Sequence, residues 1–166
     1  MSTRGLEPTV QQSVLDRLMD FEPQLAGDPP ISWSESVIRL RNSVRRDLEW
    51  LLNTRRIAEP ASADFPEVQA SLYHFGLPDI SSLSRDSSET PETLRRRIEE
   101  CIRLFEPRLT AVQVLTRDTA ASDVHHALHF SIQAILDMEP NPERVTFDTV
   151  LEVGSGEFSI TSDIHG

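Results

Sequence analysis

The spacing of apolar residues changes at Pro107, and no other feature of the sequence constrains the fold as much. Upstream, apolar side chains recur every three or four residues, the period of a helix with one buried face. Downstream, from Leu109, they alternate with polar residues, as in a strand with one buried face. Helices followed by alternating strands are typical of the α+β class. We expect N-terminal helices packed on a small antiparallel or mixed C-terminal sheet.

An amphipathic helix and a linker are predicted for residues 1–30. The helix covers residues 10–20, where apolar side chains lie at helical spacing. The segment after it cannot continue a helix, because it contains Pro23, Gly27, Pro29 and Pro30.

The main domain is predicted to span residues 31–153. Its first long helix begins near Ser32 or Ser34, either of which can cap it, and the next long helix begins at Pro91. Three alternating runs then supply the strands of the sheet. Residues 154–166 continue neither pattern, so they are expected to form an acidic, flexible tail.

The chain is strongly acidic. It carries a net charge of -11, and its 16 basic residues are all arginine. An acidic chain repels nucleic acids, and no apolar run approaches the roughly 20 residues of a membrane span, so neither kind of partner is predicted. A single cysteine cannot form an internal disulfide, and the first residues lack an apolar signal core. These two features predict a cytoplasmic protein.

Residues 39–56 oppose the overall acidity of the chain. Six arginines in this segment face only Asp47 and Glu49. Guanidinium groups suit planar, bidentate recognition of carboxylates at protein interfaces. The segment is therefore a candidate partner-binding surface, although a solvated helix face would carry the same pattern. The candidate residues are Arg45, Arg46, Arg55 and Arg56.

No catalytic, cofactor or metal site is predicted. Cys101 lies on an apolar helical face, where a buried packing thiol is expected rather than a nucleophile. His125, His126 and His129 lie before and within an alternating strand, and no further ligand has the spacing of a typical metal site. Glu106 could serve as the acid of a glycosidase, but the sequence does not identify the second carboxylate that such an enzyme needs.

Glu106, Pro107 and Arg108 stand where the helical pattern gives way to the strand pattern. In one interpretation they only end the helix, because proline cannot continue it and an arginine can bind the terminal carbonyls. In another they form a docking element for a partner. The tripeptide alone does not decide between these interpretations.

Three motifs in a fixed order carry a family resemblance. They are LLNTRR at residues 51–56, FGLPD at residues 75–79 and RRIEECIRLFEPRL at residues 96–109, and VLDRLMD at residues 14–20 adds a fourth match. Together they resemble the TssE family, the type VI secretion baseplate subunit related to a phage tail wedge protein once described as lysozyme-like. The resemblance covers roughly residues 14–153. It departs from the family pattern at Phe75, where a tyrosine is expected.

The resemblance implies a non-catalytic structural component of the baseplate wedge. Glu106 and Arg108 would pair with charged groups of TssF and TssG, Pro107 would fix the helix end that presents them, and the arginines of the second helix would join the interface. The fold would resemble the strand-exchange domain of the contractile sheath, and its sheet would initiate sheath assembly by accepting strands of TssB and TssC.

Further expectations follow from the same resemblance. TssK and the VgrG hub of the tube are additional candidate partners, and the chain would lie in a cytoplasmic baseplate docked at the inner membrane. The alternative that stays open is a peptidoglycan-cleaving, lysozyme-like glycosidase.

Overall fold

The computed structural model describes residues 10–19, 23–24, 27, 31–59, 61–62, 64–78, 91–117 and 127–162. Helices come first in the described chain, and strands follow. The helices are α1 (Val14–Leu18), α2 (Trp33–Asn53), α3 (Pro66–Gln69), the short 3₁₀ helix η1 (Leu72–His74) and α4 (Pro91–Phe105). The strands are β1 (Leu109–Arg117), β2 (Ala127–Leu136), β3 (Glu143–Glu152) and β4 (Glu157–Ser162).

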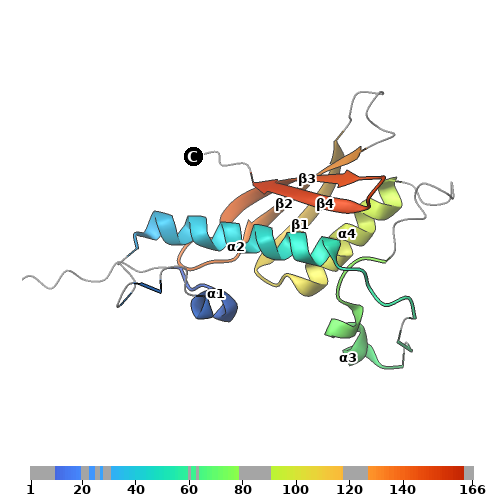
Figure 1. The fold of residues 1–166 in the computed structure, drawn as a ribbon, viewed down its shortest axis with the longest axis horizontal. Helices are drawn as coiled ribbons and strands as arrows, with labels where there is room; N and C mark the ends of the chain where they lie inside the picture. Colours follow the sequence, from blue (N-terminus) through green and yellow to red (C-terminus); the bar gives the residue numbers. More distant parts are fainter. Residues whose placement is uncertain are drawn as a thin grey trace, which may run out of the picture.

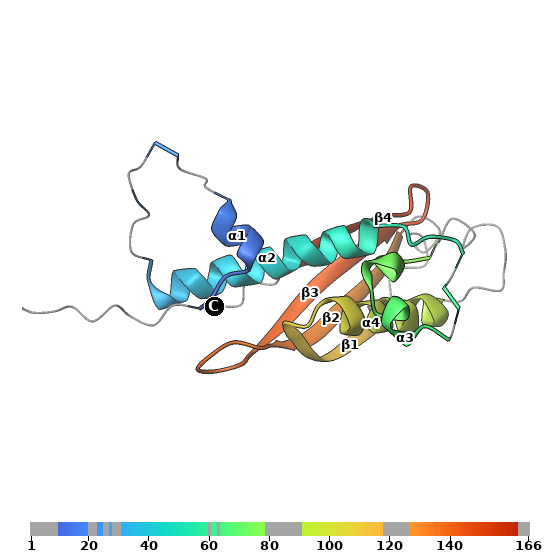
Figure 2. The ribbon, with the colours of Figure 1, turned by 90° about the horizontal axis from the view of Figure 1, so that it is seen from below.

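The strands form one antiparallel sheet in the order β1-β2-β3-β4, so each strand pairs with its neighbour in the chain. Helices α2 and α4 lie against the sheet, and α1 lies against α2 on the side away from the strands (Figures 1 and 2). This two-layer arrangement confirms the predicted α+β class, and the sheet is antiparallel rather than mixed.

The two long helices begin as the sequence predicts. The side chain of Ser32 caps α2 by accepting a hydrogen bond from the backbone N–H of Glu35 at 3.3 Å. Pro91 is the first residue of α4, whereas its predicted cap, Thr90, lies outside the described residues. Each helix buries a single apolar stripe, and the arginines lie mostly outside it.

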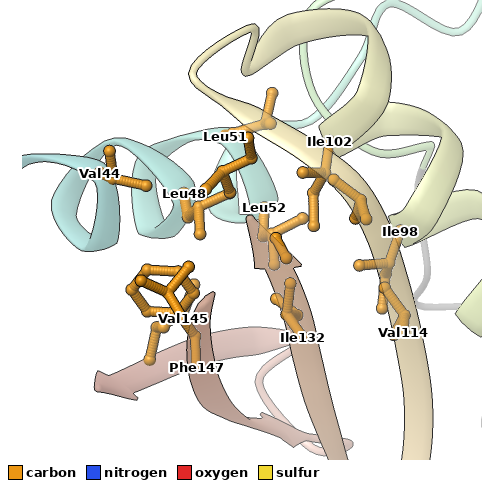
Figure 3. Packing of buried hydrophobic residues seen from close by; sticks show 14 of the residues in the cluster. Val44, Leu48, Leu51, Leu52, Ile98, Ile102, Val114, Ile132, Val145 and Phe147 are labelled. Carbon is orange, nitrogen blue, oxygen red and sulfur yellow. The ribbon is translucent and has the colours of Figure 1, made fainter. Parts of the chain in front are cut away.

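The core lies between these stripes and the inner face of the sheet (Figure 3). Val44, Leu48 and Leu52 of α2 approach Val145, Phe147 and Ile132, while Ile98 and Ile102 of α4 approach Val114. All ten labelled side chains are buried. Alternation along the strands places their apolar residues on this face, as the period of 2 predicted.

A bulge interrupts the alternation at the start of β1. The pairing register with β2 shifts between Thr110 and Gln113, and Ala111 has a φ of 49°. The extra residue lets Leu109, before the bulge, and Val112, after it, both point into the core.

The prediction of a flexible tail for residues 154–166 is wrong for residues 157–162, which form β4 and pair with β3. Phe158 and Ile160 of this strand are buried. The prediction failed because two apolar residues are too few to establish a period. A tight turn through Gly156 (φ 72°) brings the segment back along β3, and the pairing then stabilises it.

The N-terminal helix is shorter than predicted and lies with its polar side inward. Ser13 caps α1, and Val10 is buried ahead of it. In contrast, Val14, Leu15 and Leu18 are exposed. The apolar spacing therefore predicted the helix but not the direction in which its apolar face points.

Candidate docking site

The three sequence motifs meet in space at Gly76. The end of α2, the FGLPD segment and α4 converge there, in a set of contacts that we call the Gly76 junction. Its members are Thr54, Arg55, Arg56, Phe75, Gly76, Leu77, Cys101 and Phe105. The backbone N–H of Leu77 donates to the Thr54 carbonyl at 2.9 Å, and the N–H of Arg56 donates to the Leu77 carbonyl at 2.8 Å. These two bonds tie the segment to the end of α2.

Gly76 occupies a position that other residues would not tolerate. Its φ is 98°, and a Cβ atom built there would lie 2.2 Å from the Thr54 carbonyl oxygen. The ring of Phe75 packs edge-on against Phe105, with 5.3 Å between centroids. The position where a tyrosine was expected therefore contributes an aromatic contact to the junction.

Cys101 is a packing residue of the same junction. Its thiol is buried and lies 3.5 Å from the Gly76 carbonyl oxygen, to which it donates. Burial raises the pKa of Cys101 to about 11, against smaller opposing effects of the Gly76 contact and of Arg56. A thiol so far from its ionised form at neutral pH suits packing rather than nucleophilic attack.

Glu106 and Arg108 form an ion pair across the exposed Pro107, at the corner between α4 and β1. Glu106 Oε1 accepts from Arg108 Nε at 2.7 Å, and Oε2 accepts from Nη2 at 2.5 Å, a bidentate contact. Arg108 Nη2 also donates to Asp47 Oδ2 of α2 at 2.6 Å. The corner is thereby fixed to the middle of α2.

The contacts continue from Asp47 to α1. Arg46 donates to Asp47 Oδ1 at 2.8 Å and to Asp16 Oδ1 at 2.8 Å. Ser43 donates to Asp16 Oδ2 at 2.6 Å and accepts from Arg108 Nη1 at 3.3 Å. We call this set the Arg108 cluster. Its members are Asp16, Ser43, Arg46, Asp47, Glu106 and Arg108.

The Arg108 cluster is partly accessible and carries a net charge. The side chains of Arg108 and Asp47 are each 24% exposed, whereas that of Glu106 is 6% exposed. Three carboxylates and two guanidiniums give the cluster one excess negative charge. Burial lowers the pKa of Arg108, but Glu106 and Asp47 outweigh it, so the pKa lies above its ordinary value and the group stays charged.

Asp16 is held in its charged form by the same contacts. Burial raises the pKa of Asp16, but hydrogen bonds from Ser13, Ser43 and Arg46 together outweigh that effect. The net pKa is therefore lower than that of an ordinary aspartate.

The structure brings together only some of the predicted site residues. Arg46, Glu106 and Arg108 meet in the cluster, with Pro107 between the last two. Arg45 instead lies beside β4, where it donates to the Ile160 carbonyl. Arg55 and Arg56 lie at the Gly76 junction, where the backbone of each meets Leu77.

The sequence did not single out Asp16, Ser43 or Asp47 as site residues. Arg46 and Asp47 lie three and four residues after Ser43 on one helix, a spacing that places both beside Ser43 on one face. That spacing could have linked Asp47 to the arginines. No local pattern connects Asp16 with residues so far along the chain.

The remaining candidates stay apart from this site. His129 lies half-buried in β2, while His125 and His126 are outside the described residues. The described part of the chain has no group of three His, Cys, Asp or Glu side chains arranged to hold a metal ion. Nor does any helix in the described ranges combine the length and apolarity of a membrane span.

A family model described as baseplate wedge protein gp25 matches residues 38–141, which is more than half of the chain. The chain belongs to the baseplate wedge protein gp25 family. This family includes TssE of type VI secretion, so the resemblance inferred from the motifs is confirmed. A search of curated proteins finds no match.

Membership of the gp25 family gives the chain a structural role in a phage tail-like baseplate, in contact with other baseplate proteins. The matched segment includes the whole Gly76 junction and all of the Arg108 cluster except Asp16. The contact of α1 with the cluster therefore comes from outside the segment that the family model matches.

Proposed function

We propose that the chain is a TssE-like wedge component of a type VI secretion baseplate, and that the Arg108 cluster is its docking site for TssF and TssG. The observation that carries this proposal is the fixed, partly exposed ion pair of Glu106 and Arg108. Pro107, between them, is exposed and ends α4. A charged pair held rigidly at a helix end is suited to specific contact with another protein.

The charges of the Arg108 cluster indicate which partner groups it would bind. The guanidinium of Arg108 already holds carboxylates of this chain, and the cluster has one excess negative charge. A positively charged side chain or an N–H donor of TssF or TssG would complement it better than another carboxylate. Arg46 joins this docking site, and Arg45, Arg55 and Arg56 would contact a partner only if the interface extends to β4 and to the Gly76 junction.

The proposed role includes assembly of the sheath. The antiparallel sheet has β1 and β4 as its edges, and strands of TssB and TssC would add to an edge to initiate the contractile sheath. TssK and the VgrG hub are proposed as neighbours in a cytoplasmic baseplate docked at the inner membrane.

Co-purification tests the docking proposal. The wild-type chain and a Glu106→Ala/Arg108→Ala variant are each co-expressed with the TssF-like and TssG-like proteins of the same source. The wild type is expected to be recovered in a complex and the folded double variant is not. Equal recovery of both chains would overturn the role of the Glu106–Arg108 pair, and recovery of neither would overturn the choice of partners.

In the glycosidase alternative, Glu106 would have to act as a general acid. A general acid must donate a proton to a substrate, but both carboxylate oxygens of Glu106 accept hydrogen bonds from Arg108. This pairing favours docking over catalysis. Release of soluble fragments from purified peptidoglycan, abolished by Glu106→Gln, would instead support the enzyme.

A further inference from the structure

Helix side chains cover the outer edges of the sheet. The edge strand of a sheet normally presents unpaired N–H and C=O groups, to which another strand can add. Here, Val114 of β1 directs both backbone groups at α4 instead. Its N–H donates to Glu99 Oε2 at 3.1 Å, and its carbonyl accepts from Arg95 Nη1 at 2.9 Å. The Val112 carbonyl accepts from Arg103 Nη2 at 2.9 Å.

The three covering side chains of α4 also bind one another. Glu99 is ion-paired with Arg95 at 2.9 Å and with Arg103 at 2.6 Å. We call Arg95, Glu99 and Arg103 the β1 cap. Because each member is both ion-paired and bonded to the strand, the cap supplies the donors and the acceptor that a neighbouring strand would otherwise supply.

The opposite edge is covered in two ways. At Ile160 the cover resembles the β1 cap, because Glu49 Oε1 accepts from the Ile160 N–H at 3.4 Å, Arg45 Nη1 donates to the Ile160 carbonyl at 3.2 Å, and the two side chains are ion-paired. Phe158 is covered differently. Asn53, at the end of α2, donates to the Phe158 carbonyl and accepts from the Phe158 N–H, both at 2.8 Å. Asparagine has a short side chain, so this double contact holds the backbone of α2 close to β4. A further strand would lie about 4.8 Å from β4, where the end of α2 stands in its way.

The β1 cap consists of longer side chains. Arginine and glutamate have more rotatable bonds than asparagine, so they can turn away from the edge more readily. The side chain of Arg103 is 56% exposed, so it can turn away from the strand into solvent. The bulge at Ala111 limits the usable edge to the segment from Val112 to Arg117. Figure 2 shows α4 lying beside β1.

We propose that the β1 cap closes the β1 edge in the isolated chain, and that an incoming extended segment must displace Arg95, Glu99 and Arg103 to pair with β1. The proposal rests on the strand-addition role given under Proposed function, and it specifies the edge that accepts the strand. The Phe158 part of β4 stays closed, because the short side chain of Asn53 bonds both backbone groups of Phe158 and holds the end of α2 beside them.

Amide exchange in the isolated chain tests the cap without any partner. Glu99→Ala removes the acceptor for the Val114 N–H, so exchange at Val114 is expected to accelerate about fivefold or more. Arg96→Ala/Glu100→Ala is the matched control, because it removes the same kinds of charge from the exposed side of α4 and should leave Val114 unchanged. Unchanged exchange at Val114 in Glu99→Ala would overturn the cap.

Binding of the TssB-like and TssC-like sheath proteins tests displacement. The triple variant Arg95→Ala/Glu99→Ala/Arg103→Ala is expected to bind them more tightly than the wild type. The dissociation constant should fall by about the same factor as the exchange rate of the Val114 amide rises in this variant. Both measurements report the fraction of chains with an open edge. If the triple variant does not fold, Arg103→Ala alone opens the Val112 end and should bind more tightly by a smaller factor.

The outcomes separate this proposal from the role on which it rests. Weaker or equal binding by the folded triple variant would overturn displacement of the cap. If no version binds the sheath proteins, the strand-addition role fails. Faster Val114 exchange together with new self-association of the triple variant would then still support a cap that closes the edge.

Discussion

The Gly76 junction and the Arg108 cluster share one family motif, residues 96–109, but different interactions hold them together. The motif contributes Cys101 and Phe105 to the junction, and Glu106 and Arg108 to the cluster. The junction is joined by backbone hydrogen bonds and by the packing of Phe75 and Cys101, and a glycine with positive φ fits a space without room for a side chain. The cluster is charged, partly exposed and built from side chains of three separate segments. The difference separates residues that the fold requires from residues that a partner can reach.

The largest effect is expected from Gly76→Ala. A left-handed backbone costs a non-glycine residue about 1–2 kcal/mol, and the clash with the Thr54 carbonyl adds about 1–3 kcal/mol. The free energy of unfolding should therefore fall by about 2–5 kcal/mol in urea titration. Gly154→Ala, where nothing lies within 4 Å, is the control and should change it by less than about 0.5 kcal/mol. Equal stabilities would show that the junction does not depend on Gly76.

The next largest loss of stability is expected from Arg108→Ala. The variant Glu106→Ala/Arg108→Ala shows how much of that loss comes from leaving Glu106 unpaired. Removal of Arg108 leaves Glu106 buried without its cation, so the free energy of unfolding should fall by about 2–3 kcal/mol. Glu106→Ala/Arg108→Ala also removes the Glu106 carboxylate, so no unpaired charge stays buried there, while Asp47 keeps Arg46 as its partner. The double variant should lose only about 1 kcal/mol, measured in the same titration. A double variant less stable than Arg108→Ala would contradict this account of the cluster.

A smaller and local effect is expected from Asp16→Asn. It weakens the contact of α1 with Arg46 and Ser43, so the amides of Arg17 and Met19 should exchange faster while global stability changes little. The pKa of Asp16 is lowered in the folded chain, so its stabilising effect is present above an ordinary pKa of about 4 and lost as the pH falls below it. The exchange protection of the Arg17 and Met19 amides should differ between the wild type and the variant at pH 7, and this difference should shrink as the pH falls below about 4. A difference that does not shrink as the pH falls would mean that the Asp16 charge is not responsible.

The smallest effect is expected from thiol reagents. With the pKa of Cys101 raised to about 11 from 9.0, the thiolate fraction at pH 8 is roughly a hundredfold lower than in the unfolded chain. Alkylation by iodoacetamide, followed by mass spectrometry, should be very slow in the native chain and rapid in guanidinium chloride. Rapid alkylation of the native chain would show that the junction opens readily.

The sequence predicted the parts of the fold that depend on long periodic segments. Helix α2, helix α4 and strands β1 to β3 each carry several apolar residues at one spacing, and the Ser32 cap and Pro91 marked two helix starts. Strand β4 was missed because only Phe158 and Ile160 mark its inner face, and its order comes from pairing with β3.

The candidate site could be predicted only in part. The Glu106–Arg108 pair is local, so the sequence could propose it. The contact of Arg108 with Asp47 joins residues that are 61 positions apart, and the contact of Ser43 with Asp16 spans 27 positions. Such contacts depend on how α2 lies across the α4–β1 corner, which no spacing along the chain specifies.

The most direct test of the central claim is the dissociation constant of the purified chain for a reconstituted complex of the TssF-like and TssG-like proteins. Glu106→Ala/Arg108→Ala is compared with Glu35→Ala/Arg39→Ala, which removes an exposed ion pair of the same composition from α2. With both variants folded, the first should weaken binding at least about thirtyfold, equivalent to about 2 kcal/mol, and the second by less than about threefold. Equal dissociation constants for the two variants would contradict the claim that the Arg108 cluster is the docking site.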